Sequence, residues 1–202
     1  MAKRAFDLLV ATLALLLLWP LMLGIALWIK LDSPGPALFR QQRVGRDGRL
    51  FSIRKFRTMV DGAAERGPLI TVGDDPRITR AGAFLRRSKL DELPQLIDVL
   101  AGHMSLVGPR PELPAYVARY PQALRDKVLA VRPGITDPVS LAMADEGALL
   151  AAAANPEREY IEVLLPRKLR AAVAYAESAT LATDLRVIGQ TLRLLWARAL
   201  QR

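Results

Sequence analysis

Two acidic residues, Asp91 and Glu92, stand side by side in the segment SKLDELPQL (88–96) of an otherwise strongly basic chain. As a structural feature, Asp91 would cap the N-terminus of a helix, with Glu92 in the first turn and Pro94 still early enough to be tolerated. The same position also suits chemistry, because a helix start attracts anions. An ordinary Asp titrates near pH ~4, so its carboxylate could attack a phosphoryl group without a general base. The pattern alone leaves both interpretations open.

Basic residues that could bind phosphate lie on both sides of this acidic pair. Arg86 precedes it, and Arg110 sits in the turn GPRP (108–111), where two prolines restrict the backbone. Lys55 and Arg57 alternate in KFRTM, so both can leave one face of a strand. Because arginine recognises phosphate oxygens with a planar, bidentate donor set, we expect a phosphate-rich ligand.

The composition narrows the chemistry further. The chain has 202 residues with 29 Lys+Arg against 20 Asp+Glu, a formal net charge of +9 that favours anionic partners. It has no cysteine, which excludes disulfides and thiol catalysis, and one histidine, His103, which excludes a histidine-cluster metal site. Neither a P-loop nor a GxGxxG motif is present, and no zinc-finger or RNP motif supports nucleic-acid binding.

The N-terminal part is a membrane segment by composition. From Leu8 to Ile29 the chain carries 22 residues without a charge, and as a helix these would extend about 33 Å, enough to cross a bilayer core. Pro20 should kink that helix, so the segment either crosses once or enters and returns to the same face. Both flanks are basic, the downstream one more strongly, which places the bulk of the chain on the cytoplasmic side.

The remaining pattern predicts a mostly helical α+β unit covering residues 1–202. Two strands, 37–44 and 50–58, should form a short β-hairpin with its turn at GRDG (45–48), followed by a loop over 61–75. Helical segments are expected at 80–90, 91–100 and 114–130. Further helices should run from Asp145 to Leu165, interrupted at Asn155-Pro156 and stopped at Pro166.

The last segment carries an apolar stripe at helical spacing: Leu181, Leu185, Ile188, Leu192 and Leu195. One interpretation is a terminal helix that packs this stripe into the core. The other is a basic amphipathic helix at the membrane interface, with Trp196 near the headgroups.

Several ordered segments together resemble a known family, the bacterial sugar transferases, or monotopic phosphoglycosyl transferases. The resemblance covers roughly 3–136 and is carried by KRAFD, SPGPALFRQQRVGRDGRLFSIRKFRTM, DPRITRAGAFLRRSKLDELPQLIDVLAGHMSLVGPRPE and VRPGIT. It implies transfer of a sugar-1-phosphate from a UDP-sugar to membrane polyprenyl (undecaprenyl) phosphate, with release of UMP. Such a step begins a bacterial glycan pathway, for an exopolysaccharide, an O-antigen or a glycoprotein.

The resemblance also assigns roles to residues. It implies that Asp91 attacks the sugar-bearing phosphate to form a covalent phosphosugar intermediate, and that Glu92 helps to hold Mg²⁺. Arg86 and Arg110 fall on the phosphate-contacting arginines, while Lys55, Arg57 and Arg132 are further candidates. His103 stands where the family usually has Asp, and the segment DPVSLAMADEG, starting at Asp137-Pro138, departs from the family pattern.

For the membrane segment, the resemblance implies a re-entrant helix over residues 5–30 that breaks at Trp19-Pro20 and stays in one leaflet. The catalytic part would then face the cytoplasm at the inner membrane, surrounded by interfacial helices. The expected partners are the UDP-sugar, polyprenyl phosphate and the membrane, without nucleic acid, and a homodimer is left open. The rival hypothesis is a membrane-anchored basic adaptor that binds anionic lipid or nucleic acid without catalysis.

Overall fold

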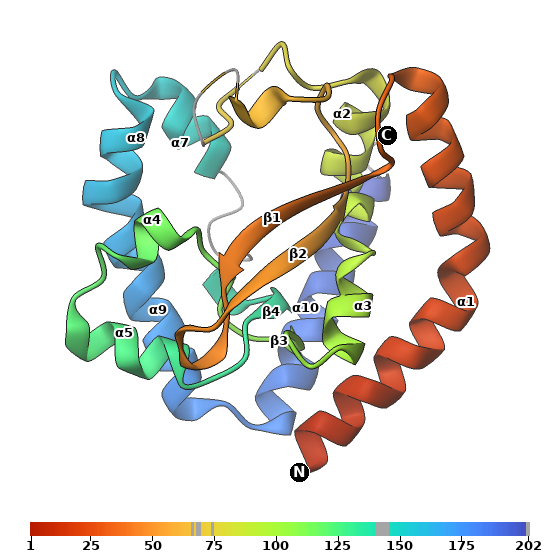
Figure 1. The fold of residues 1–202 in the computed structure, drawn as a ribbon. Coiled ribbons are helices and arrows are strands. Elements are labelled where there is room, and N and C mark those ends of the chain that lie inside the picture. Colours follow the sequence, from red (N-terminus) through yellow and green to blue (C-terminus); the bar gives the residue numbers. More distant parts are fainter. Residues whose placement is uncertain (66, 68–69, 74, 140–145, 201–202) are drawn as a thin grey trace.

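In a computed structural model, which describes residues 1–65, 67, 70–73, 75–139 and 146–200, the apolar N-terminal run forms one helix, α1 (Ala2–Asp32). The helix is longer than the expected 5–30 and continues through Pro20 without a break in its secondary structure. Figure 1 shows that it changes direction partway along its length, as a helix lacking one backbone donor can. By length and composition α1 could cross a membrane, and most of its leucines are exposed.

The predicted β-hairpin is confirmed. Strands β1 (Leu38–Val44) and β2 (Leu50–Phe56) pair antiparallel, with Leu38 opposite Phe56 and Val44 opposite Leu50. A 3-10 turn at Arg46–Gly48 joins them, and Asp47 and Gly48 both take positive φ there. Because side chains alternate along a strand, Phe51 and Ile53 enter the core and Lys55 continues the same row.

The central elements follow the hairpin. Helix α2 (Arg80–Ser88) and helix α3 (Gln95–Leu100) lie between α1 and the hairpin in Figure 1, and two short strands, β3 (Ser105–Val107) and β4 (Gly134–Thr136), pair in parallel. The largest core cluster joins α1, β2, α3, β3 and the C-terminal helices. It comprises Ala11, Phe51, Ile53, Leu96, Val99, Met104, Leu106, Val107, Tyr175 and Val187.

The C-terminal half is helical and differs from the prediction at two prolines. The expected helix 114–130 is two helices, α4 (Pro114–Val117) and α5 (Gln122–Leu129), because Pro121 cannot continue the first. Pro166 does not stop its helix. Helix α8 (Pro156–Glu159) leads through a π-helical turn at Tyr160–Leu164 into α9 (Leu165–Ser178), and this wider turn precedes the proline that lacks a donor.

Two predictions in this half need separate comment. The interruption at Asn155 is confirmed, since its side chain accepts a hydrogen bond from the Arg158 N–H at the start of α8. The preceding helix is α7 (Glu146–Ala152), and the start predicted for it at Asp145 lies outside the described residues, as do positions 140–144 of the DPVSLAMADEG segment.

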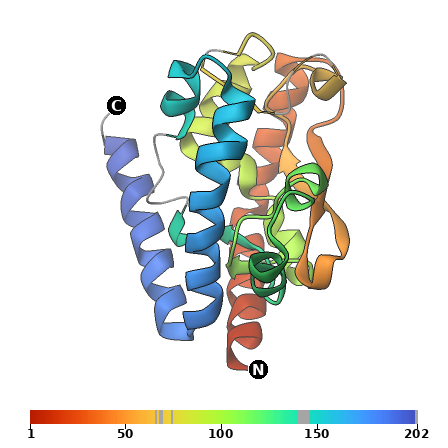
Figure 2. The same ribbon diagram turned by 90° about the vertical axis from the view of Figure 1, so that its left-hand side faces the viewer.

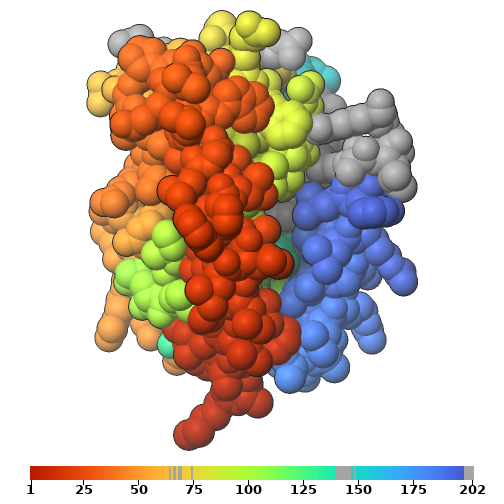
Figure 3. Space-filling model, turned by 90° about the vertical axis from the view of Figure 1, so that its right-hand side faces the viewer, coloured from red at the N-terminus to blue at the C-terminus, as the bar shows by residue number. Residues whose placement is uncertain are grey.

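The last helix, α10 (Leu181–Leu200), packs only part of the predicted stripe: Ile188 lies against the largest core cluster. Its packed face carries Asp184 and Val187, while Leu185 and Leu192 are exposed and Trp196 is 70% exposed. The core-packing interpretation of that stripe is therefore wrong for these residues. Figure 3 shows α1 and α10 side by side on one face of the molecule, so their exposed apolar side chains share a surface.

Candidate functional site

The acidic pair lies on a tight turn rather than at the start of an α-helix. Lys89 adopts the left-handed conformation (φ 58°) and ends α2, and Leu90–Glu92 then form a 3-10 turn before α3 starts at Gln95. No side chain caps that turn, so the predicted N-cap role of Asp91 is wrong. The turn instead brings both carboxylates into the protein, where each residue is 8% exposed.

Glu92 is held by two cations from distant parts of the chain. Its Oε1 accepts a hydrogen bond of 2.7 Å from Arg110 Nη2 and one of 3.0 Å from Lys55 Nζ. Burial alone would favour the neutral acid, but the positive charges of Arg110 and Lys55 outweigh it and hold the pKa of Glu92 well below its usual range. Glu92 is therefore ionised at neutral pH.

Arg110 projects from a rigid segment. A Cβ at Gly108 would lie 2.3 Å from the Arg132 carbonyl oxygen, so only glycine permits this backbone approach. The Gly134 N–H donates to the Pro109 carbonyl at 3.0 Å and fixes the segment against β4. The Glu92 carboxylate raises the pKa of Arg110, which keeps the guanidinium charged.

Asp91 differs from its neighbour in having an uncommitted oxygen. Its Oδ1 is buried and accepts no hydrogen bond from the described residues. Burial, and then the charge of Glu92, raise the pKa of Asp91, while Lys55 opposes that rise. Arg86 lies within its electrostatic range: burial lowers the pKa of this arginine, and Asp91 is the strongest charge acting against that shift.

The other two predicted phosphate ligands hold backbone instead. Arg57 Nη2 donates to the Ser33 carbonyl at 2.7 Å and to its hydroxyl at 2.9 Å, just beyond the end of α1. Arg132 Nε donates to the Gly102 carbonyl at 2.9 Å. The structure thus joins Lys55 and Arg110 to Glu92 by hydrogen bonds, and the charges of Arg86 and Asp91 act on each other. Phosphate binding by all five basic residues stays a prediction.

Three features near the site escaped the sequence analysis. Gln95 is buried one turn after Asp91, and its Nε2 has no partner among the described residues; the i, i+4 spacing could have indicated it. Arg43 on β1 feels the charges of Glu112, Arg110 and Glu92, and Tyr160 donates to Glu112 at 2.6 Å. These last contacts cross the chain and leave no local sequence signal.

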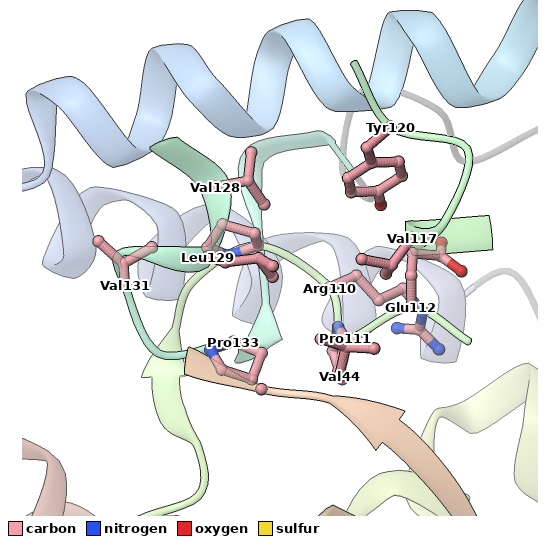
Figure 4. A pocket seen from close by; sticks show the side chains of 12 residues that line it. Val44, Arg110, Pro111, Glu112, Val117, Tyr120, Val128, Leu129, Val131 and Pro133 are labelled. Atoms are coloured by element: carbon pink, nitrogen blue, oxygen red, sulfur yellow. The ribbon is translucent and has the colours of Figure 1, made fainter. Parts of the chain in front are cut away.

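A small pocket borders the Arg110 segment on the side of α4 and α5. Figure 4 shows Tyr120 and Val117 on its upper wall and Val128 and Leu129 beside them, with Arg110 and Glu112 at one end. The lining is therefore mostly apolar, with charge at the end nearest the acidic pair.

His103 stacks on the Phe51 ring at a centroid distance of 5.6 Å. An imidazole over an aromatic ring acts here as a packing group on the hairpin.

The acidic pair fits a magnesium ion in one specific way. Mg²⁺ prefers hard oxygen ligands and is usually held by one or two carboxylates together with substrate phosphates. The uncommitted Asp91 Oδ1 and the adjacent Glu92 carboxylate supply such oxygens. Among the described residues, no group of three or more His, Cys, Asp or Glu side chains forms a metal cage, so an ion would need phosphate oxygens to complete its shell.

Comparison with known proteins places the whole chain in one context. The sequence profile described as "Bacterial sugar transferase" matches residues 1–198. A UDP-glucose:undecaprenyl-phosphate glucose-1-phosphate transferase of Caulobacter vibrioides is 41% identical over 198 residues, which cover 94% of this chain and 68% of that protein.

Two further relatives are similar over shorter stretches. The enzyme of the same name from Escherichia coli K12 is 48% identical over 136 residues, 66% of this chain and 29% of that protein. The exopolysaccharide production protein PSS of Rhizobium leguminosarum is 56% identical over 109 residues, 54% of each chain. The matched stretch thus spans about a third to a half of these two relatives.

Proposed function

Because the chain belongs to the bacterial sugar transferase family, we propose that it transfers a sugar-1-phosphate from a UDP-sugar to membrane polyprenyl (undecaprenyl) phosphate and releases UMP. The names of the Caulobacter vibrioides and Escherichia coli relatives support a UDP-sugar donor and an undecaprenyl phosphate acceptor. The name of the Rhizobium leguminosarum relative supports a role in making an extracellular glycan.

The observation that carries the proposal is the unequal state of two adjacent carboxylates. Glu92 is fixed by Arg110 and Lys55, whereas Asp91 keeps a buried oxygen that has no partner among the described residues. A buried, unpaired acceptor is costly and needs an explanation in a native protein. A nucleophile awaiting its substrate provides one, and Glu92 then acts as a fixed charge.

The reaction that follows has two displacement steps. In the first, an Asp91 oxygen attacks the phosphorus that bears the sugar, and the bond from that phosphorus to the bridging oxygen breaks, so that UMP leaves with the electron pair. In the second, an oxygen of polyprenyl phosphate attacks the same phosphorus and the Asp91–phosphorus bond breaks. The products are a polyprenyl diphosphate sugar and the free Asp91 carboxylate, as covalent catalysis requires.

The basic residues overcome the electrostatic problem of this reaction. A carboxylate that approaches a diphosphate meets two negative groups, and phosphoryl transfer depends mainly on positioning and charge stabilisation. The charge of Arg86 acts on Asp91 and Arg110 binds Glu92, so both guanidinium groups are placed to receive phosphate oxygens near the acidic pair. Burial and then Glu92 raise the pKa of Asp91, and Lys55 opposes that rise and so favours the nucleophilic form.

Mg²⁺ is the proposed cofactor, with Glu92 as its protein ligand. When bound, such an ion neutralises charge on the diphosphate and on the leaving UMP. Arg110 and Lys55 both donate to Glu92 Oε1, so they fix the orientation of this carboxylate. They thereby also fix the direction in which its other oxygen, Oε2, points.

A re-entrant placement of α1 at the cytoplasmic face is supported by contacts at both of its ends. Near the start, Arg4 donates to the Val99 carbonyl at 2.8 Å. At the end, Asp32 accepts from the Ala81 N–H at 3.0 Å. A helix bound at both ends to one protein body is better placed in one leaflet than across the bilayer, and the basic flanks assign that body to the cytoplasm.

The apolar face shared by α1 and α10 would then be the membrane side. Leu185, Leu192 and Trp196 of α10 are exposed, as are most leucines of α1, and the two helices lie side by side (Figure 3). Tryptophan is enriched at the headgroup level, and arginines beside such a face suit anionic lipid. The acceptor phosphate would therefore reach the site without its lipid tail leaving the membrane. A homodimer stays an open prediction.

The test is UMP release from a panel of UDP-sugars by the full chain in lipid nanodiscs that contain polyprenyl phosphate. We expect release with at least one donor, abolition by EDTA, and loss of at least about 10³-fold in Asp91→Asn. Asp126→Asn, which changes an exposed aspartate of α5, is the matched control. Release of no UMP from any donor, together with lipid or nucleic-acid binding that weakens evenly with salt, would instead support the basic adaptor.

A further inference from the structure

A polar cluster around the buried Asp184 ties the start of α1 to the C-terminal helices. Lys3 Nζ forms an ion pair with Asp184 in the first turn of α10, and Asp184 is 1% exposed. Tyr175 of α9 donates its hydroxyl to the other Asp184 oxygen at 2.6 Å. Figures 1 and 2 both show the N-terminus beside the turn that joins α9 to α10.

Both side chains also approach one backbone atom. The Val107 carbonyl oxygen accepts a hydrogen bond from Lys3 Nζ at 3.1 Å, and the Tyr175 hydroxyl oxygen, whose single proton goes to Asp184, lies 3.1 Å from the same carbonyl oxygen. Val107 is the last residue of β3, and the chain runs directly from it through Gly108 and Pro109 to Arg110. We propose that Lys3, Asp184 and Tyr175 form a lock that positions Arg110 against Glu92 through the Val107 carbonyl.

The segment between the lock and Arg110 has little freedom to absorb a displacement. The Gly108 N–H donates to the Thr136 carbonyl at 3.1 Å. A Cβ at Gly134 would lie 2.1 Å from the Gly108 nitrogen, so the two backbones are already in contact. Tightly packed segments transmit shifts rather than damp them. A movement of Val107 should therefore move Arg110.

A neighbouring residue on the same turn of α1 reinforces the lock. Asp7, four residues after Lys3, accepts from the Ser105 hydroxyl at 2.8 Å and from the Leu106 N–H at 3.2 Å. Lys3 and Asp7 therefore engage β3 from its first residue to its last, since residues four apart share a helix face. The position of α1 and the position of Arg110 are therefore coupled through β3.

The lock rests on the proposed function for its catalytic consequence, and a double-mutant design tests that consequence. We expect Lys3→Met to lower kcat/KM for UMP release about tenfold, and Lys3→Arg to recover most of the loss. In an Arg110→Met background, Lys3→Met should cost less than about twofold, because it acts through Arg110. Lys127→Met, which removes an exposed lysine paired with Glu177, is the matched control.

Equal losses from Lys3→Met in both backgrounds would overturn the positioning role, as would a lowered melting temperature with unchanged kcat/KM.

A second measurement does not depend on activity. Because the chain has no cysteine, spin labels will attach only to cysteines that are introduced, here by Ala2→Cys and Ala182→Cys at two exposed positions. The lock predicts one narrow distance distribution that broadens in Asp184→Asn. A broad distribution without that substitution would refute the lock even if UMP is released, whereas a narrow one without UMP release would refute only the proposed function.

Discussion

Removal of Arg110 should expose how strongly the site depends on the charge of Glu92. The Arg110–Glu92 contact of 2.7 Å is charge-assisted, and such hydrogen bonds contribute about 1.5–3 kcal/mol. Breaking a fully buried pair costs about 3–5 kcal/mol because one charge stays uncompensated. Here the Arg110 side chain is 33% exposed and Lys55 still binds Glu92, and both facts reduce the penalty. Arg110→Met should therefore lower the free energy of unfolding by about 2 kcal/mol.

A double-mutant cycle isolates the interaction energy between Arg110 and Glu92. Arg110→Met, Glu92→Gln and the double variant are compared by thermal unfolding in one detergent, where about 2 kcal/mol corresponds to about 4–8 °C in a chain of this size. The double variant carries no uncompensated carboxylate, so its loss should be about 2 kcal/mol smaller than the sum of the two single losses. A coupling energy below about 0.5 kcal/mol would refute the view that this pair organises the site.

The pH dependence of the same variants gives an internal check. The pKa of Glu92 is depressed, so the stabilisation is present above the ordinary glutamate pKa of about 4.3 and is lost as the pH falls toward the folded-state value. The difference in the free energy of unfolding between the unmutated chain and Arg110→Met should therefore have its full value at pH 7 and become smaller below about pH 4. A difference that stays constant with pH would mean that Arg110 stabilises the fold by packing.

Three further predictions follow from individual contacts. Lys55→Met should raise the pKa of Asp91, because Lys55 lowers it, and the acid limb of the pH profile of UMP release should move to higher pH; an unmoved limb would exclude Asp91 as the titrating group. Arg57→Met should lower the free energy of unfolding by about 1–3 kcal/mol through its lost contacts to Ser33, measured as a fall in melting temperature against Arg40→Met on exposed β1 surface. Brominated lipids should quench the fluorescence of Trp196, so Trp196→Phe should show less quenching than the unmutated chain. Equal quenching in the two proteins would mean that α10 does not lie at the membrane surface.

Local signals predicted the elements whose structure is determined by nearby residues. The segments 37–44 and 50–58 predicted the two hairpin strands, and the GRDG turn predicted their connection. Asn155 predicted a helix boundary because its side chain caps the following helix directly. These features need only contacts within a few residues.

Features set by tertiary packing could not be predicted in this way. The capping role expected of Asp91 failed because Lys89 takes a left-handed conformation and redirects the chain into a 3-10 turn. The pairing of Glu92 with Arg110 joins residues on different elements, and no local pattern reports it. The sequence left two interpretations of the apolar stripe of α10 open, and the core-packing one fails for Leu185, because Asp184 turns its neighbouring face inward to meet Lys3.

The family resemblance supplied what spacing could not. It singled out Asp91, Glu92 and Arg110 from an acidic pair and many arginines, and the structure then brought Glu92 and Arg110 into contact. It named Arg57 only as a further candidate, and the structure binds this side chain to Ser33 just beyond the end of α1. The site residues stay predictions, and the geometry shows which of them contact one another.

The most direct test of the central claim is the mass of the chain after incubation with a UDP-sugar in the absence of polyprenyl phosphate. If Asp91 is the nucleophile, the chain should gain the mass of one sugar phosphate on the peptide that contains Asp91, and addition of polyprenyl phosphate should remove it. UMP release with an acceptor but no adduct on Asp91 under any quench condition, or an adduct that persists in Asp91→Asn, would contradict the account.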